Sequence, residues 1–383
     1  MKKSLLSLAF GTFALGIAEF GMMGILNDVA ADLGISVVNA GHLISAYSTG
    51  VAVGSPFLII LRKLPLRRLM LLLAAVIALG NAMVALSPNF TCLLISRFVS
   101  GLPHGAFFGA GAIVCSRLAG QGKGASAVAV LVGGMTVANL IGVPGFTFLC
   151  HLVSWRLPFA IVSLGGAMAF VAIRSWVPVL SPLPDTGVKG QFRFLTHLAP
   201  WLIYGGVFFG QASVYCWLSY IAPIMTRVTH FSNDAMSLIM VIVGAGMVFG
   251  NFLAGKLADR YSPALVTAVF ASVVVVLMPM VYFFAGYKIP SVIFAFVAPG
   301  LLFGIGGPLQ YIIVKFAKGG EMLGGAGIQI AFNVSNAVAA AIGGVAIRHG
   351  FGLASPALVG VPCAVIGAIS LFVLYHKYHS KGA

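Results

Sequence analysis

The chain has 383 residues, of which 60% are hydrophobic and only 8% are charged. A soluble domain is about half apolar and about a quarter charged, so this balance excludes a soluble globular protein and indicates a chain solvated by lipid. The formal net charge of +15 would suit a nucleic-acid partner only if the basic residues were gathered on one surface.

Apolar segments follow one another along the whole chain, and each is long enough to cross a bilayer as a helix. A spanning helix needs about 20 predominantly apolar residues. The segments run over 5–27, 38–61, 66–87, 90–118, 125–150, 156–178, 197–223, 233–255, 262–285, 289–315, 323–347 and 354–378. We therefore predict an all-α membrane protein with twelve transmembrane helices.

The first segment begins like a secretory signal, with Lys2 and Lys3 before an apolar stretch. That stretch is longer than the roughly 7–15 apolar residues of a signal core, and it contains Glu19. Eleven further segments follow it. We interpret it as an uncleaved first helix.

The basic residues are distributed unequally between the two sides of the membrane. Seventeen of the 22 lie in turns on the side of both termini, four lie on the other side, and Arg97 lies inside a segment. This bias is what the positive-inside rule produces. We expect both termini to be cytoplasmic, and we expect no nucleic-acid partner.

A long connection rich in Pro and Gly, 177–194, divides the segments into two sets of six. Gly50 and Gly54 in the second segment have counterparts in Gly246 and Gly250 of the eighth, at one shared offset. Such duplication is typical of transporters whose substrate sites lie between two bundles near the midplane. We expect two pseudo-symmetric six-helix bundles at 1–178 and 197–383, joined by a cytoplasmic linker at 179–196.

The fifth segment carries small residues at every fourth position, Gly134, Ala138 and Gly142, followed by Pro144. Small residues at this spacing let helix backbones approach closely in lipid. Gly142 and Pro144 are therefore candidate gating residues. Plain helix packing with no moving part explains the same pattern equally well.

One acidic side chain lies deep in a segment. Of the seven acidic residues, only Glu19 is far from a helix end or a connection, although a charge at the bilayer centre costs roughly 2.5–3.5 kcal/mol. Counted from the ends of their segments, Glu19 and Arg97 reach a similar depth. We expect Arg97 to offset part of the cost of burying Glu19, so that the carboxylate can take up and release a proton. A permanent structural ion pair is the alternative.

Polar side chains also follow the helical repeat on two later segments. On the seventh and eleventh segments they are Tyr204, Phe208, Gln211 and Tyr215, and Gln329, Asn333 and Asn336. Such stripes must face protein or a wet cavity, because lipid would leave their amides unpaired. With His104 and Gln310 they are candidate cavity residues for a small solute. Hydrogen bonds that only hold helices together are the alternative.

The sequence lacks motifs for nucleotide, metal or redox chemistry. "GNFLAGKL" (250–257) resembles a P-loop, but it lacks the Ser/Thr and ends a helix instead of following a strand. The five cysteines are scattered singly and are interpreted as core residues. We expect no cofactor and no metal. An intramembrane enzyme with Ser100 as nucleophile and His104 as base is an alternative from another class, although no third group that would orient His104 is evident.

Several stretches resemble motifs of the major facilitator superfamily: "RFVSG" (97–101), "ANLIGVPG" (138–145) and "GKLADR" (255–260). With "AEFGMMG" (18–24) and "GGAGIQIAFN" (324–333), the chain is similar to the drug:proton antiporter group, and within it to the bacterial arabinose efflux permeases. The resemblance implies the major facilitator fold and alternating access by rocking of two six-helix bundles. Helices one, four, seven and ten would then line one cavity that holds Glu19, Arg97, His104 and Gln310.

The resemblance also implies a gate in the turn after the eighth helix, at Gly255, Asp259 and Arg260. Asp259 would stabilise the outward-closed state through Arg260 and the N-terminus of helix eleven. The corresponding turn of the first half, "LRKLPLRR" (61–68), departs from the pattern because it has no acid.

We expect a proton-coupled secondary transporter of the bacterial inner membrane that exports a small, sugar-like organic solute, with Glu19 as the proton carrier. The alternatives are a proton-driven multidrug or nucleoside efflux pump, and a passive facilitator in which Glu19 is structural. The expected partners are the solute, protons and the lipid bilayer. We expect the chain to act as a monomer and not as an enzyme.

Overall fold

The computed structural model describes residues 2–35, 37–181, 183–232 and 235–378. Within these ranges the chain is helical and contains no strand, as predicted. The helices are α1 (Lys2–Gly24), α2 (Leu26–Leu33), α3 (Val37–Gly54), α4 (Leu58–Leu61), α5 (Leu66–Ala85), α6 (Phe90–Gly101), α7 (Pro103–Leu118), α8 (Gly124–Val137), α9 (Val143–Leu152), α10 (Arg156–Trp176), α11 (Gly187–Phe192), α12 (Leu198–Leu218), α13 (Ile221–Arg227), α14 (Ala235–Arg260), α15 (Pro263–Phe283), α16 (Lys288–Phe316), α17 (Glu321–Arg348) and α18 (Pro356–Tyr378).

Eleven helices of the described residues are long and apolar enough to cross a membrane, when α6 is counted with α7, α8 with α9 and α12 with α13. One lies in each predicted segment except 38–61. In that segment α3 ends at Gly54, and a 3-10 turn over Ser55–Phe57 separates it from α4. Pro56 lies in this turn and lacks the N–H that would continue the α-helical hydrogen bonds. The count of twelve spanning helices stays a prediction.

Prolines also shape the fourth and fifth segments. α6 and α7 meet at Leu102, directly before Pro103, where the Leu102 N–H donates to the Val99 carbonyl at 3.2 Å. In the fifth segment, residues Ala138–Gly142 form a π turn between α8 and α9. Pro144 has no N–H to donate to the preceding turn, and a wider turn accommodates the loss. Both predicted helices are therefore interrupted near their middle.

The described helices belong to two compact units. Unit 1 comprises Met1–Gly120, Val130–Phe194 and Ala317–Ile330, and unit 2 comprises Gln121–Ala129, Leu195–Phe316 and Ala331–Ala383. The start of α17 therefore belongs to unit 1 and its remainder to unit 2. The predicted division into bundles at 1–178 and 197–383 stays a prediction.

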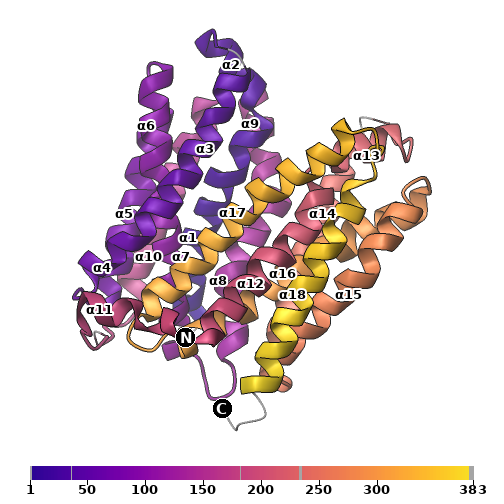
Figure 1. The fold of residues 1–383 in the computed structure, drawn as a ribbon. Helices are drawn as coiled ribbons and strands as arrows, with labels where there is room; N and C mark the ends of the chain where they lie inside the picture. The colour runs from indigo at the N-terminus through magenta and orange to yellow at the C-terminus, as the bar shows by residue number, and fades with distance from the viewer. Residues whose placement is uncertain (1, 36, 182, 233–234, 379–383) are drawn as a thin grey trace. The chain divides into compact units, whose positions relative to one another are not determined.

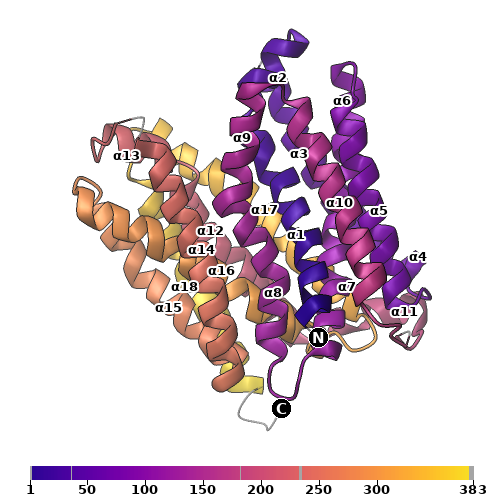
Figure 2. The ribbon, with the colours of Figure 1, turned by 180° about the vertical axis from the view of Figure 1, so that it is seen from behind.

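In unit 1, α1 packs against α10, α9 and the π turn, and α5 packs against α10 and α6. Figures 1 and 2 show the N-terminus and α11 at one end of this unit, and α2 and the start of α6 at the other. The linker helix thus shares an end of unit 1 with the N-terminus.

In unit 2, α14 packs against α16 and α12 packs against α18, while α15 contacts both α16 and α18 (Figures 1 and 2). The connection before α8 and the first part of α8, Gln121–Ala129, belong to this unit too, and the side-chain amide of Asn251 donates to the Ala129 carbonyl at 2.8 Å. Asn251 is fully buried, so this hydrogen bond fixes α14 against residues 121–129.

The glycines that suggested an internal repeat make equivalent contacts. A Cβ on Gly50 would overlap the Phe98 carbonyl of α6, and a Cβ on Gly246 would overlap the Phe296 carbonyl of α16. Each glycine thus lets its helix touch the backbone of a partner helix, which no larger residue permits. The shared packing supports the interpretation that the two halves arose by duplication.

Candidate functional site

Glu19 is a buried acid in the last third of α1, with its side chain only 6% exposed. Its Oε2 atom lies 3.8 Å from Nε2 of His104, which is longer than a hydrogen bond. No described residue forms a hydrogen bond with this oxygen or with Nε2 of His104. Two polar atoms therefore face each other in a buried site with neither of them satisfied, which is uncommon in proteins.

His104 is held in place by its other ring nitrogen. Its Nδ1 atom lies 2.9 Å from the hydroxyl of Tyr47 on α3, and its ring stacks on Phe108 with centroids 5.3 Å apart. The chain break before Pro103 places His104 in the first turn of α7. The orienting group that the sequence did not reveal is therefore Tyr47.

Tyr47 has one proton to donate and two acceptors to choose from, Nδ1 of His104 at 2.9 Å and the Leu15 carbonyl at 3.4 Å. If the hydroxyl donates to Nδ1, the imidazole carries its hydrogen on Nε2 and points it at Glu19. If the hydroxyl donates to Leu15, Nε2 presents a lone pair that a protonated Glu19 can reach. The geometry can therefore hold one proton on either side of the Glu19–His104 gap.

Arg97 lies next to Glu19 but does not pair with it. Its guanidinium is fully buried, donates to the carbonyls of Ala18 at 2.7 Å and Leu43 at 3.3 Å, and lies over the Tyr47 ring at 4.5 Å. The contact with Ala18 confirms that Arg97 and Glu19 share a depth. The salt bridges among the described residues include none between the two, and both the proton-carrier role of Glu19 and the alternative of a structural ion pair stay predictions.

The start of α17 lies beside α7 in unit 1. A Cβ on Gly109 would overlap the Met322 carbonyl, and one on Gly105 would lie 3.5 Å from the carbonyl of Ala326. Gln329, one helical turn beyond Ala326 along α17, lies close to His104, although it completes no hydrogen bond to Nε2. Of the predicted cavity residues, Glu19, Arg97, His104 and Gln329 are thus brought together in unit 1.

The remaining predicted cavity residues lie in unit 2. They are Tyr204, Phe208, Gln211 and Tyr215 on α12, Gln310 on α16, and Asn333 and Asn336 on α17. The hydroxyl of Ser335 donates to the Phe208 carbonyl at 2.5 Å, which joins α17 to α12. The ring of Phe332 lies 5.9 Å from that of Tyr215 and 6.0 Å from that of Phe303. These aromatic side chains lie on the same helices as the amides. A single cavity that contains the predicted residues of unit 1 and of unit 2 stays a prediction.

Two of these amides have an unsatisfied carbonyl oxygen. Oε1 of Gln211 and Oδ1 of Asn336 are buried without a hydrogen-bond partner among the described residues. An unpaired buried acceptor costs about 1–3 kcal/mol. Oδ1 of the structural Asn251 is unpaired in the same way, so the pattern fits both a cavity lining and purely structural hydrogen bonds.

Asp259 caps a different helix from the one expected. Its Oδ1 accepts from the Ala125 N–H at 2.9 Å, and its Oδ2 accepts from the Ser126 N–H at 3.1 Å. The capped N-terminus is that of α8, the fifth predicted segment. Arg260 contacts the ring of Tyr261 at 5.3 Å, and the predicted contact of Asp259 and Arg260 with helix eleven stays a prediction. Gly255, one turn earlier on α14, faces Ala129 with no room for a side chain.

The small residues of the fifth segment fit against α1. A Cβ on Gly134 would overlap the Ala9 carbonyl, and one on Gly142 would lie within 3 Å of the Ile17 side chain. Gly142 ends the π turn, and Pro144 lies in the first turn of α9 directly after it. The π turn therefore packs against α1, the helix that carries Glu19. A gating role for Gly142 and Pro144 stays a prediction.

The hydrogen bonds of the described residues include none between Ser100 and His104, the nucleophile and base of the enzyme alternative. The hydroxyl of Ser100 donates to the Arg97 carbonyl at 2.8 Å, and the interruption at Leu102 separates it from His104. No group of three or more potential metal ligands occurs among the described residues.

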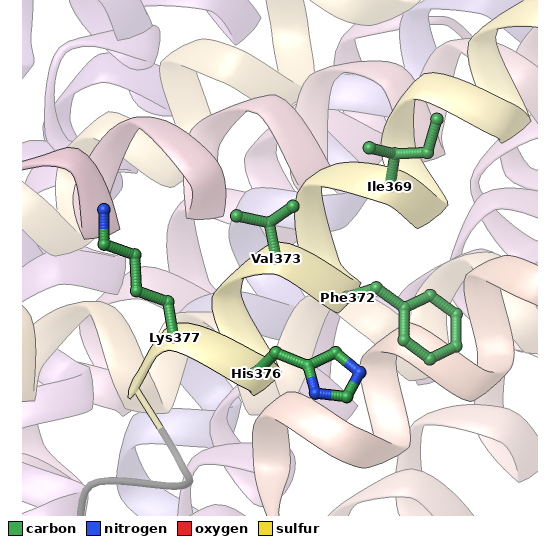
Figure 3. Close-up of a pocket in the computed structure, with 5 residues that line it drawn as sticks. All are labelled: Ile369, Phe372, Val373, His376 and Lys377. Carbon is green, nitrogen blue, oxygen red and sulfur yellow. The ribbon is translucent and has the colours of Figure 1, made fainter.

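Figure 3 shows a pocket on α18 that is remote in sequence from every predicted site residue. It is lined by Ile369, Phe372, Val373, His376 and Lys377, and it contains no acid.

Comparison with known proteins agrees with the helical architecture. The sequence matches the family model of the Major Facilitator Superfamily over residues 8–324. It is 44% identical to "Putative transporter AraJ" of Escherichia coli strain K12, over 100% of this chain and 97% of that protein. It is 28% identical to a "Probable sugar efflux transporter" of Helicobacter pylori strain G27, over 96% of this chain and 93% of that protein.

The fold is also similar to a solved structure. The crystal structure of the transporter FucP in the outward conformation matches with a TM-score of 0.78 and 16% identity, over 98% of each chain. The matched proteins are membrane transporters and not enzymes, so the alternative of an intramembrane enzyme is wrong. From the extent of the family match and the full-length similarity to AraJ, the chain belongs to the Major Facilitator Superfamily.

Proposed function

We propose that the protein is a proton-coupled secondary transporter of the bacterial inner membrane, which exports a small, sugar-like organic solute by alternating access. The observation that carries the proposal is the buried, unsatisfied gap of 3.8 Å between Glu19 and His104. A buried carboxylate needs either a paired cation or a proton. Arg97 gives two hydrogen bonds to backbone carbonyls and forms no salt bridge with Glu19, which supports a proton as the counter-charge.

Proton exchange across the gap requires only a small movement. Shortening the distance between Oε2 and Nε2 by about 1 Å brings the two atoms within hydrogen-bond range. A proton that enters on one face and leaves on the other can then drive transport without nucleotide, since the membrane potential supplies about 2.3 kcal/mol per charge per 100 mV. Arg97 sets the electrostatic environment of Glu19 in this scheme.

A sugar-like solute suits the polar and aromatic residues of unit 2. Sugars present hydroxyl groups for amides and an apolar ring face for aromatic side chains, and binding sites commonly combine the two. Gln211 and Asn336 offer free carbonyl oxygens, and Tyr215 and Phe332 offer rings. The Helicobacter pylori relative is named as a sugar efflux transporter, and we extend that substrate class to this chain.

Asp259 would act as the gate of this cycle. The turn after α14 lies on the side predicted to be cytoplasmic, and α8, which Asp259 caps, begins in unit 2 and continues into unit 1. We therefore propose that Asp259 stabilises the outward-open state, rather than the outward-closed state that the resemblance implied.

The proposal is tested with purified protein in liposomes under an imposed pH gradient, with internal pH recorded. The panel of solutes contains pentoses, hexoses, nucleosides and a set of cationic and neutral drugs. We expect a sugar to accumulate against its gradient while protons move in the opposite direction. Drug or nucleoside movement without sugar movement would identify the alternative pump. Sugar equilibration without proton movement would identify a passive facilitator, and either result would overturn the proposal.

Replacing Asp259 with Ala should loosen the first turn of α8. The variant loses both hydrogen bonds to the Ala125 and Ser126 amides, which we expect to cost about 1 kcal/mol. Hydrogen exchange of peptides covering 121–129 should accelerate about fivefold. Asp259→Asn keeps an acceptor and should give an intermediate rate, whereas Lys256→Ala on the same helix should leave the rate unchanged. If peptides covering 121–129 exchanged at the same rate in all three variants, Asp259 would have no role in the gate.

A further inference from the structure

The linker between the two sets of helices is folded and packed, although a segment that only joins two bundles has no need of either. It forms α11 and then a 3-10 turn over Arg193–Thr196. Gln191 is 5% exposed and Phe194 is 2% exposed. Connections normally run over the surface, so the burial of these two side chains shows that the linker is docked on the rest of unit 1.

One side of the linker is fixed to the turn after the second segment. Oδ1 of Asp185 lies 2.7 Å from Nε of Arg62, and its Oδ2 lies 3.7 Å from Nζ of Lys63. The same carboxylate accepts from the N–H of Gly187 at 3.0 Å, which starts α11. The turn at 61–68 has no acid of its own, and the linker supplies one.

The other side of the linker holds the start of α17. The Gly319 carbonyl accepts two hydrogen bonds from the linker, from the Thr186 hydroxyl at 2.7 Å and from the Gln191 amide at 2.7 Å. Gly319 has a φ of +86°, which favours glycine. A Cβ on Gly320 would overlap the Gln191 carbonyl. The linker and the residues before α17 therefore fit each other closely in unit 1.

α17 is the helix through which this contact has a wider effect. Its start belongs to unit 1 and its remainder to unit 2. The start packs against α7, which carries His104, and the remainder carries Asn333 and Asn336. Any motion that carries α17 away from α7 must also break the hydrogen bonds of Thr186 and Gln191 to Gly319.

We propose that the linker is a latch of the cytoplasmic gate, in which Asp185 anchors it to Arg62 while Thr186 and Gln191 hold the start of α17. The latch is closed in this structure and must release each time the transporter opens to the cytoplasm. Asp185, Thr186 and Gln191 are thus positioning residues of the transport cycle. The inference rests on the alternating-access part of the proposed function, and not on proton coupling or on the identity of the solute.

The test measures how readily the start of α17 becomes exposed. Met322, which is 2% exposed beside Gly109, is replaced by Cys in a protein whose five native cysteines are replaced by Ser. A membrane-impermeant maleimide is added to vesicles whose linker face is outermost, with no solute and no pH gradient. The measured quantity is the rate at which the reporter is labelled.

We expect Gln191→Ala and Asp185→Arg each to accelerate labelling by about two- to fivefold, the range that a lost side-chain hydrogen bond or ion pair gives. Arg62→Asp should do the same, and the charge-swapped pair Arg62→Asp with Asp185→Arg should return the rate to that of the parent. Lys189→Ala in the same short helix is the matched control and should have no effect. Size-exclusion profiles and melting temperatures identify variants that fail to fold.

Unchanged labelling in folded Asp185→Arg and Gln191→Ala variants would overturn the latch, as would a charge swap that fails to restore the parent rate. The labelling requires neither transport nor protons, so a failure of proton-coupled export in liposomes leaves this result readable. The Arg62 hydrogen bond, with that of the Gly187 amide, holds the pKa of Asp185 below its ordinary value. Its charge is therefore lost only as the pH falls through that lowered pKa. The thiolate fraction of the reporter rises with pH, so the quantity compared is the ratio of the variant rate to the parent rate, and this ratio should not change between about pH 6 and pH 8.

Discussion

Glu19→Gln should reduce proton-coupled efflux to the level of protein-free liposomes while leaving the protein folded. The amide has the shape of the protonated acid but cannot release a proton, so the step that couples solute to protons is lost. Because the variant resembles one state of the cycle, it should still exchange labelled solute for unlabelled solute across the membrane. The measurement is paired, with efflux and internal pH recorded in one preparation and solute exchange in a second.

The matched control for this variant is Asp32→Asn, another acid of unit 1 that lies outside the spanning helices. Hydrogen bonds from Trp155 and Arg156 hold the pKa of Asp32 below its ordinary value, so it stays ionised throughout the assay range and exchanges no proton there. Asp32→Asn should therefore retain coupling. Wild-type pH dependence in Glu19→Gln would show that Glu19 does not carry the proton.

A companion variant, Tyr47→Phe, tests the orientation of His104 independently of the proposed proton carrier, Glu19. It keeps the ring over Arg97 but removes the hydroxyl from Nδ1 of His104. A lost hydrogen bond of about 1 kcal/mol should move the pH of half-maximal transport by up to about one unit, with coupling retained. An unchanged pH profile would limit Tyr47 to a packing role.

The helices and the depth of the buried charges were predictable because both follow from local sequence. Apolar length locates eleven spanning helices, and counting residues along two segments brings Glu19 and Arg97 to one level. Neither apolar length nor residue counting can identify a side chain that a third helix contributes to the site. Tyr47, which orients His104 and contacts Arg97, was missed because its role arises only where α3, α6 and α7 meet. A large tyrosine among the mostly small residues of "ISAYSTG" (44–50) was the available signal.

The partner of Asp259 on α8 was not predicted, for a related reason. The sequence identifies Asp259 as an acid at a helix end, but it does not reveal which helix N-terminus lies within reach. The structure places that carboxylate on α8, and it supplies the first-half turn with an acid from the linker, Asp185, over 120 residues away along the chain. Pairings of this kind depend on tertiary contacts between distant segments, which a motif comparison does not provide.

Gly250→Ala should destabilise the protein more than any other single methyl group added to a described helix of unit 2. The Gly250 Cα faces the backbone of Gly300 on α16, and an added Cβ would overlap the Gly300 carbonyl. A backbone atom cannot rotate away as a side chain can, so α14 and α16 must separate along their length. Overpacking of this kind costs roughly 1–3 kcal/mol or more, which should appear as a lower melting temperature in detergent.

Two matched substitutions make this expectation specific. Gly306→Ala on α16 meets no atom within 4 Å and should be neutral or slightly stabilising, because Ala favours a helix over Gly by about 1 kcal/mol. Gly54→Ala, the counterpart of Gly250 in the first half, would overlap the Leu102 carbonyl and should destabilise by a similar amount. If Gly250→Ala and Gly306→Ala had the same melting temperature, close backbone contact at Gly250 would not be what holds α14 against α16. If Gly54→Ala and Gly250→Ala instead lost equal stability, the same close backbone contact would hold the equivalent helix pair in each half, as duplication predicts.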